Sequence, residues 1–247
     1  MSSHKGTISC LALILVLSFG AFAQDSPNTN EWGQKFNTPG ATLTVKETHR
    51  TQMNERTVVH YDIFASGLPT ATEYILWFWV IGGRPQSVAR AYISSSGQLV
   101  NNPPNPQHPS GTTPIDFAAL GGKGEPKRLA LTSKDGQYRA FHEVVPFPIE
   151  AHDNSCTLSV VMGAPRYSIV AVQGSGFQPS EELFIETQSE NEKGQGKTKV
   201  SDQGTFVAVV GPIVKGKASG NTRFTVTGEA CKVSVEFPWG QDSYQYQ

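Results

Sequence analysis

The sequence predicts an all-β protein of two tandem antiparallel β-sandwiches, the first of which carries a long loop insertion. Short stretches alternate between apolar and polar residues, as strands with one buried face do. The chain contains 24 glycines and 16 prolines, which favours many turns over long helices. A series of landmarks also occurs twice in one order: a glycine turn, a strand, a second glycine turn and a strand that contains a cysteine.

These landmarks define the two predicted copies. Residues 65–69 are echoed by 174–179, residues 135–140 by 203–208, and residues 155–160 by 230–235. We therefore expect the first sandwich to occupy residues 41–163 and the second to occupy residues 165–240, with a boundary at Met162-Gly163-Ala164-Pro165.

The N-terminus is typical of a secretory signal peptide. Residues 8–22 are an apolar run after a weakly basic start, and Ala21-Phe22-Ala23 fits the cleavage pattern of small residues. We expect cleavage after Ala23, a secreted or periplasmic location and no stable membrane span afterwards; a retained anchor is the alternative. Polar residues 24–40 predict a flexible leader.

The first copy begins with predicted strands over residues 41–47, 57–64 and 74–81. Residues 82–127 have no counterpart of similar length in the second copy, so they are the predicted insertion. We expect mostly surface loop there, with one short hairpin and one helical turn at 114–120, because insertions into β-scaffolds lie in loops that often carry function.

A hairpin around Lys134-Asp135-Gly136 then joins strands at 128–132 and 137–145, since Asp-Gly between alternating stretches is a strong hairpin signal. The chain then continues from this hairpin into the strand that contains Cys156. The last residues, 241–247, predict a frayed tail. The second copy contains strands predicted at 167–172, 183–187, 197–200, 205–209, 222–227 and 231–237.

The two cysteines after the signal, Cys156 and Cys231, allow two interpretations. A pair of cysteines in an exported protein suggests a disulfide. Their equivalent positions in the two copies instead suggest two small buried residues in separate cores, too far apart to bond. The repeat favours the second interpretation.

The second copy resembles the bacterial immunoglobulin-like domains of the IPT/TIG type, which occur in tandem on secreted and surface proteins. The resemblance rests on Gly174-Ser175-Gly176-Phe177 followed by Pro179 and Glu181, and it extends over residues 174–237, with a divergent echo at 67–161. It implies an immunoglobulin-like sandwich that acts as a spacer, an adhesive module or a ligand-binding module.

The chain shows no catalytic or cofactor motif. His142-Glu143 lacks the second histidine of a zincin helix, and Pro146 stands in its place. The Gly194–Thr198 stretch lacks the first glycine of a phosphate loop. The net charge is −1 without a basic cluster, which argues against nucleic-acid binding. A metal-dependent hydrolase requires convergence of at least three of the histidines and nearby carboxylates. The histidines concerned are His49, His60, His108, His142 and His152.

The strongest functional signal is the stretch from Tyr74 to Ile81, which has no polar residue on either face. A sandwich strand normally shows one face to water, so the insertion, the second domain, a ligand or a partner must cover the other face. We expect a non-catalytic binding or structural module of the cell envelope, whose partner is an envelope protein or a glycan. A carbohydrate-binding protein that uses Trp77 and Trp79 is one alternative. The expected working surface comprises Trp77, Trp79, Arg84, Arg90, Tyr92 and His108.

Overall fold

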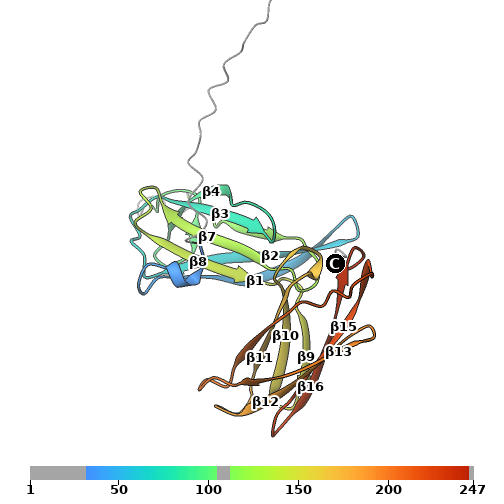
Figure 1. The fold of residues 1–247 in the computed structure, drawn as a ribbon. Coiled ribbons are helices and arrows are strands. Elements are labelled where there is room, and N and C mark those ends of the chain that lie inside the picture. The colour runs from blue at the N-terminus through green and yellow to red at the C-terminus, as the bar shows by residue number, and fades with distance from the viewer. Residues whose placement is uncertain (1–31, 105–111, 245–247) are drawn as a thin grey trace, which may run out of the picture.

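The computed structural model describes residues 32–104 and 112–244, and it confirms the predicted all-β class. Two antiparallel sandwiches follow one another, and the strands of the second run away from one side of the first (Figure 1). The predicted signal peptide, most of the leader before Trp32, His108 and the last three residues lie outside the described residues.

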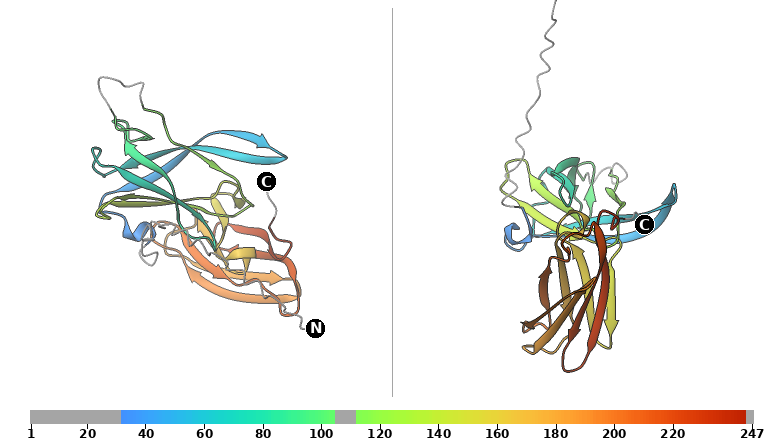
Figure 2. Two further views of the ribbon diagram at one scale, coloured as in Figure 1. Left: turned by 90° about the horizontal axis from the view of Figure 1, so that it is seen from above. Right: turned by 45° about the vertical axis from the view of Figure 1, so that its right-hand side comes forward.

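The first sandwich packs a three-stranded sheet, ordered β1-β2-β6, against a five-stranded sheet, ordered β5-β4-β3-β7-β8. One core, which includes Ile63 and Leu131, fills the space between them. The far part of the β1–β2 hairpin projects beyond the sheets (Figure 2). The strand bounds are β1 Thr42–Met53, β2 Arg56–Ser66, β3 Tyr74–Val80, β4 Gln86–Ile93, β5 Leu99–Val100, β6 Asp116–Ala119, β7 Lys127–Ser133 and β8 Arg139–Val144.

The second sandwich packs two four-stranded sheets, ordered β14-β11-β10-β9 and β13-β12-β15-β16, around a second core. Leu158 on one sheet and Phe224 on the other are fully buried in it. The strand bounds are β9 Ile149–Asp153, β10 Cys156–Met162, β11 Val170–Ser175, β12 Glu182–Ser189, β13 Glu192–Lys199, β14 Phe206–Val210, β15 Ser219–Thr227 and β16 Lys232–Gly240.

The segment predicted as a loop insertion, residues 82–127, is in fact built into the first sandwich. β4 pairs with β3, and β6 pairs with β2 in place of the predicted helical turn at 114–120. Ala91, Ile93 and Phe117 alternate with more exposed neighbours and face the core. The prediction was wrong because this segment supplies β4, β5 and β6 of the first sandwich, so its length is sheet rather than loop.

The predicted domain boundary at residues 162–165 is also wrong. β10, which the sequence assigned to the first copy, pairs with β9 and β11 in the second sandwich. The chain passes between the sandwiches at Val145-Pro146-Phe147-Pro148, before β9. Both prolines lack the backbone donor that a continuing strand needs, which ends β8 there.

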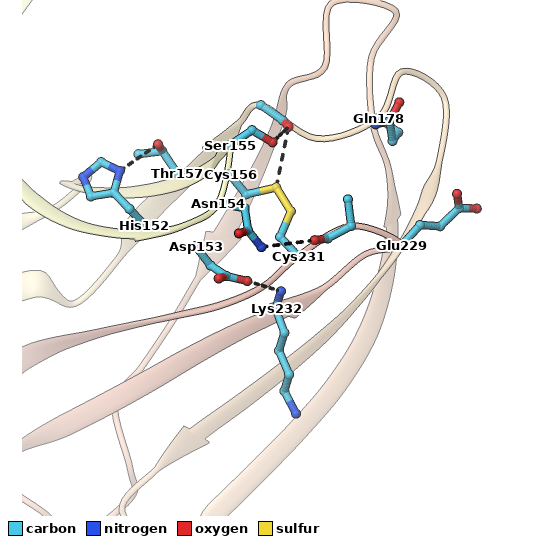
Figure 3. Close-up of a disulfide and its surroundings, with 12 residues drawn as sticks. His152, Asp153, Asn154, Ser155, Cys156, Thr157, Gln178, Glu229, Cys231 and Lys232 are labelled. Carbon is cyan, nitrogen blue, oxygen red and sulfur yellow. Dashed lines mark hydrogen bonds between the residues drawn. A yellow bond between two sulfur atoms is a disulfide. The ribbon is translucent and has the colours of Figure 1, made fainter.

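Consequently the two cysteine strands are facing strands of one sandwich rather than equivalent strands of two. Cys156 starts β10, Cys231 immediately precedes β16, and a disulfide joins them across a Cα–Cα distance of 6.4 Å (Figure 3). The backbone N–H of Lys232 donates to Asp153 Oδ2 at 2.8 Å, which ties the same two corners together. The expectation of two separate thiols therefore fails with the boundary.

The junction between the sandwiches is a buried polar contact. The Lys127 ammonium lies 2.8 Å from Oε2 of Glu125, and both side chains are almost fully buried. Tyr244, from the tail predicted to fray, donates to the same oxygen at 2.5 Å. A Cβ on Gly121 would stand 2.5 Å from that oxygen and 2.7 Å from Lys127 Nζ, so this position has no room for a side chain.

Two further contacts complete the junction. Tyr167 of the second sandwich donates its hydroxyl to the Lys123 carbonyl, and the Met162 N–H donates to the Gly124 carbonyl at 2.8 Å. The glycine-rich stretch at 121–124 thus forms a tight loop whose carbonyl groups accept hydrogen bonds from the second sandwich. Buried partners on both sides hold the two bodies together.

Candidate binding cleft between the sandwiches

The β-sheet register sorts the aromatic strand β3 into an inner and an outer face. Tyr74 and Leu76 point into the first core and are almost fully buried. Trp77 and Trp79 occupy the outer face, where each has direct neighbours on β7 and β8. One row across the three strands is Trp77, Ala130 and Phe141, and the next is Trp79, Arg128 and Glu143.

The cover over the first of these rows is the N-terminal segment. The Trp32 ring lies 5.6 Å from that of Trp77, 5.1 Å from that of Trp79 and 5.7 Å from that of Phe141. Phe36, in the short 3₁₀ helix η2 (Gln34–Phe36), packs on the same cluster. The described part of the predicted flexible leader is therefore a folded cap, which answers what covers the outer face.

Hydrogen bonds fasten this cap to the edge of β8. The Phe141 N–H donates to Asn37 Oδ1 at 2.8 Å, and the Arg139 N–H donates to Thr38 Oγ1 at 2.9 Å. The Thr38 N–H returns a bond to the Arg139 carbonyl at 2.8 Å. Two outward donors of an edge strand are thereby satisfied.

The second row stays open and forms the floor of a cleft. Trp79 lies beyond the last pairing of β3 with β4, which ends at Phe78 and Gln86. The cleft has a volume of about 690 Å³, and Val161 and Gln173 of the second sandwich form its far wall. Sites for small ligands are typically concave, about 300–1,000 Å³ in volume, and mix apolar walls with a few polar groups.

The polar part of the floor is the pair of Arg128 and Glu143. Arg128 Nε donates to Glu143 Oε2 at 2.8 Å, and about a third of each side chain is exposed. His142 lines the cleft beside them. Burial lowers the pKa of His142, and the Glu143 carboxylate partly offsets that effect. The floor consequently pairs one positive with one negative charge.

The residues predicted as a working surface do not form one site. Trp77 is only 8% exposed and donates its indole N–H to Thr132 Oγ1 at 2.9 Å, so it supports the cleft from below. Tyr92 donates to Glu73 at 2.7 Å near Arg90, at the other end of β3. Arg84 is exposed in the turn after β3 and does not line the cleft. Trp79 alone of the described set lines the cleft.

Sequence reasoning missed the other cleft residues. Trp32 was the available signal, since a tryptophan is unusual in a polar leader and needs a place to pack. Arg128 and Glu143 become neighbours through the hairpin register of β7 and β8. The turn at Lys134-Asp135-Gly136 sets that register, so the predicted hairpin was the available signal for this pair.

The described histidines do not converge. His49 and His60 stack with ring centroids 4.2 Å apart on the β1–β2 hairpin, and His60 Nδ1 lies 2.8 Å from Asp116. His142 lines the cleft, while His152 lies on β9 of the other sandwich. Among the described residues, no cluster of three or more His, Cys, Asp or Glu could hold a metal ion.

Comparison with known proteins gives little further information. No protein-family model and no curated protein matches the chain. One solved structure, a tetra-tandem repeat from the extending region of a large adhesion protein, aligns with 82% of this chain and 50% of that one. The TM-score is 0.27 and the sequence identity 10%. The chain thus spans half the length of that structure. Within the described residues, no helix is long and apolar enough to cross a membrane.

Proposed function

We propose that this chain is an exported, non-catalytic module that binds a component of the cell envelope in the cleft between its sandwiches. The observation that carries the proposal is the cleft itself, whose floor, cap and far wall come from three separate parts of the chain. Sites built on strands with buried supports keep their geometry better than sites on loops. A spacer alone would not need such a hollow.

The proposed location rests on the apolar N-terminus and on the disulfide. Cleavage after Ala23 would deliver the chain to an oxidising compartment, where disulfides form and persist. Kinship with IPT/TIG modules is part of the same proposal and depends on Gly174-Ser175-Gly176-Phe177. N-terminal sequencing of the exported protein tests this part: a mature start at Gln24 is expected, and recovery of an intact Met1 start would overturn it.

Binding is tested with purified, fluorescently labelled residues 24–247 on intact cells and on isolated envelopes. We expect saturable binding that Trp79→Ala weakens at least tenfold, because Trp79 belongs to the cleft floor. Arg90→Ala is the matched control, since Arg90 is well exposed on the same face but does not line the cleft. Absence of saturable binding, or equal losses for the two variants, would refute the cleft as the binding site.

A further inference from the structure

The aromatic part of the cleft is a corner formed by two indoles. The Trp32 and Trp79 rings are inclined at 66° with centroids 5.1 Å apart, and both residues are half-buried. They line the cleft together, so a ligand meets apolar surface in two different planes. The face of an indole carries partial negative charge and attracts polarised C–H groups, such as those on the faces of sugar rings.

The polar groups beside this corner suit hydroxyl groups. The bond between Arg128 and Glu143 engages one guanidinium nitrogen and one carboxylate oxygen. Within residues 32–104 and 112–244, the two terminal nitrogens of Arg128 and Oε1 of Glu143 make no other hydrogen bond or ion pair. These groups offer donors and an acceptor side by side, and a sugar hydroxyl both donates and accepts.

The charge balance of the cleft floor favours an uncharged ligand over a charged one. Arg128 and Glu143 cancel, and the burial that lowers the pKa of His142 favours its neutral form. Gln34 and Gln173, which also line the cleft, are uncharged. A charged ligand would therefore find no net opposite charge to offset its loss of hydration.

The backbone around the cleft disfavours an extended peptide. β8 is the edge strand nearest the floor, and a peptide added as a strand would need its outward N–H groups. Asn37 and Thr38 already occupy the donors of Phe141 and Arg139. The occupied donors favour recognition through side chains, by ring stacking and hydroxyl contacts.

We propose that the cleft binds an uncharged glycan, with sugar rings packed in the Trp32–Trp79 corner and hydroxyl groups bonded to Arg128 and Glu143. The inference rests on the proposed function, because it names the chemical class of the envelope component. Burial of a polar sugar is favourable only if its hydroxyls find partners, which the row from Trp79 to Glu143 provides.

The test is binding of residues 24–247 to immobilised neutral oligosaccharides derived from β-glucan, mannan and chitin. Oligogalacturonate, which is anionic, and a proline-rich peptide complete the panel. We expect saturable binding to at least one neutral glycan, with quenching of tryptophan fluorescence, and at least tenfold weaker binding of oligogalacturonate and the peptide. Binding of the peptide alone or of oligogalacturonate alone would overturn the inference.

Variants link binding to the cleft. Trp79→Ala should weaken neutral-glycan binding at least tenfold and Glu143→Gln about fivefold or more, whereas Arg90→Ala should stay within twofold. Glu143→Gln preserves side-chain shape and lies at a partly exposed position, so it remains informative if Trp79→Ala fails to fold. A Glu143→Gln protein that folds and binds like the parent would contradict the assigned role of that carboxylate.

The outcomes separate this inference from the proposed function. If envelope binding depends on Trp79 but no neutral glycan binds, the glycan class is wrong and the binding module stands. If neither envelopes nor glycans bind, both proposals fail.

Discussion

The Glu125–Lys127 pair places two opposite charges almost completely out of water. Both lie at the junction and are almost fully buried, and Oε2 of Glu125 also accepts hydrogen bonds from the Gly122 N–H and the Tyr244 hydroxyl. Two charges taken out of water are tolerated only while each compensates the other. Removal of one partner therefore costs far more than removal of both.

We expect Glu125→Gln to lower the free energy of unfolding by about 3–5 kcal/mol, because it leaves the Lys127 ammonium buried without its counter-charge. The double variant with Lys127→Met should recover most of that loss. Urea unfolding followed by tryptophan fluorescence measures both proteins. A single variant within about 1 kcal/mol of the parent would mean that water reaches Lys127.

Two buried tyrosines make the folded protein less stable at alkaline pH. Burial is the main cause that raises the pKa of Tyr61 and of Tyr167 to about 12, from 10 when unfolded. Between pH 10 and 12 the unfolded chain loses protons that the folded chain keeps, so stability falls as pH rises. Each tyrosine should remove about 1.4 kcal/mol per pH unit in that window.

Absorbance at 295 nm, which reports the phenolate, should show that Tyr61→Phe and Tyr167→Phe each remove a late-titrating group. Tyr92→Phe is a less informative control, since a hydrogen bond to Glu73 rather than burial is the main cause that raises the pKa of Tyr92. Loss of all tyrosine protons by pH 10.5 in the folded protein would contradict the assignment.

At the scale of single elements, β3 depends on a cap from outside its own sheet. Its outer face carries Trp77 and Trp79, and Trp32 lies against both. Burial of aromatic surface, together with favourable edge-on ring contacts, is the main reason that the segment before β1 is folded. The cap and the strand therefore form one unit of stability.

Trp32→Ala should cost about 2 kcal/mol of unfolding free energy, less than a fully buried tryptophan would, because Trp32 is half-buried. Tryptophan emission should also shift to longer wavelength as Trp79 gains solvent. Met53→Ala, on the exposed hairpin tip, is the matched control and should lie within about 0.5 kcal/mol of the parent. An unchanged emission maximum in Trp32→Ala would show that the cap does not shield β3.

The strands that the sequence predicts well are those whose pattern decides their face. Alternation located β2, β12 and β15 to within a few residues, since Val59, Tyr61 and Ile63 point inward while their neighbours do not. β1 runs on to Met53 although all its later residues are exposed, because pairing with β2 rather than burial maintains it. No hydrophobic pattern could predict that extension.

At the scale of the whole molecule, the disulfide belongs to one sandwich only. Cys156 and Cys231 are 75 residues apart, and their bond links facing sheets. Closing a loop of that length restricts the unfolded chain and is worth about 4 kcal/mol. Both cysteines and the strands they join lie after the Val145–Pro148 passage between sandwiches.

Cys156→Ala with Cys231→Ala should lower the stability of the second sandwich by about 2–5 kcal/mol and leave the first nearly unchanged. Calorimetry on the parent with and without reductant provides the comparison, because it resolves the unfolding of the two sandwiches as separate transitions. If both sandwiches melt earlier by the same amount, the junction couples them into one cooperative unit.

The candidate site was largely beyond prediction, because it arises from long-range geometry. The aromatic strand indicated that something covers its outer face, and the structure supplies Trp32, from a segment whose composition suggested disorder. The apparent repeat also misplaced β10, because glycine turns and alternating strands recur in any sandwich. Which strands share a core is decided by pairing between distant segments, which local composition does not encode.

The close approach of Glu125 and Lys127 to Gly121 has an evolutionary consequence. A methyl group there would collide with both members of the Glu125–Lys127 pair. Positions 121, 125 and 127 should accordingly change together among relatives of this chain, because a bulkier residue at 121 requires both charged side chains to move. An alignment of relatives at these three positions would then show whether the buried charge pair at the junction is retained.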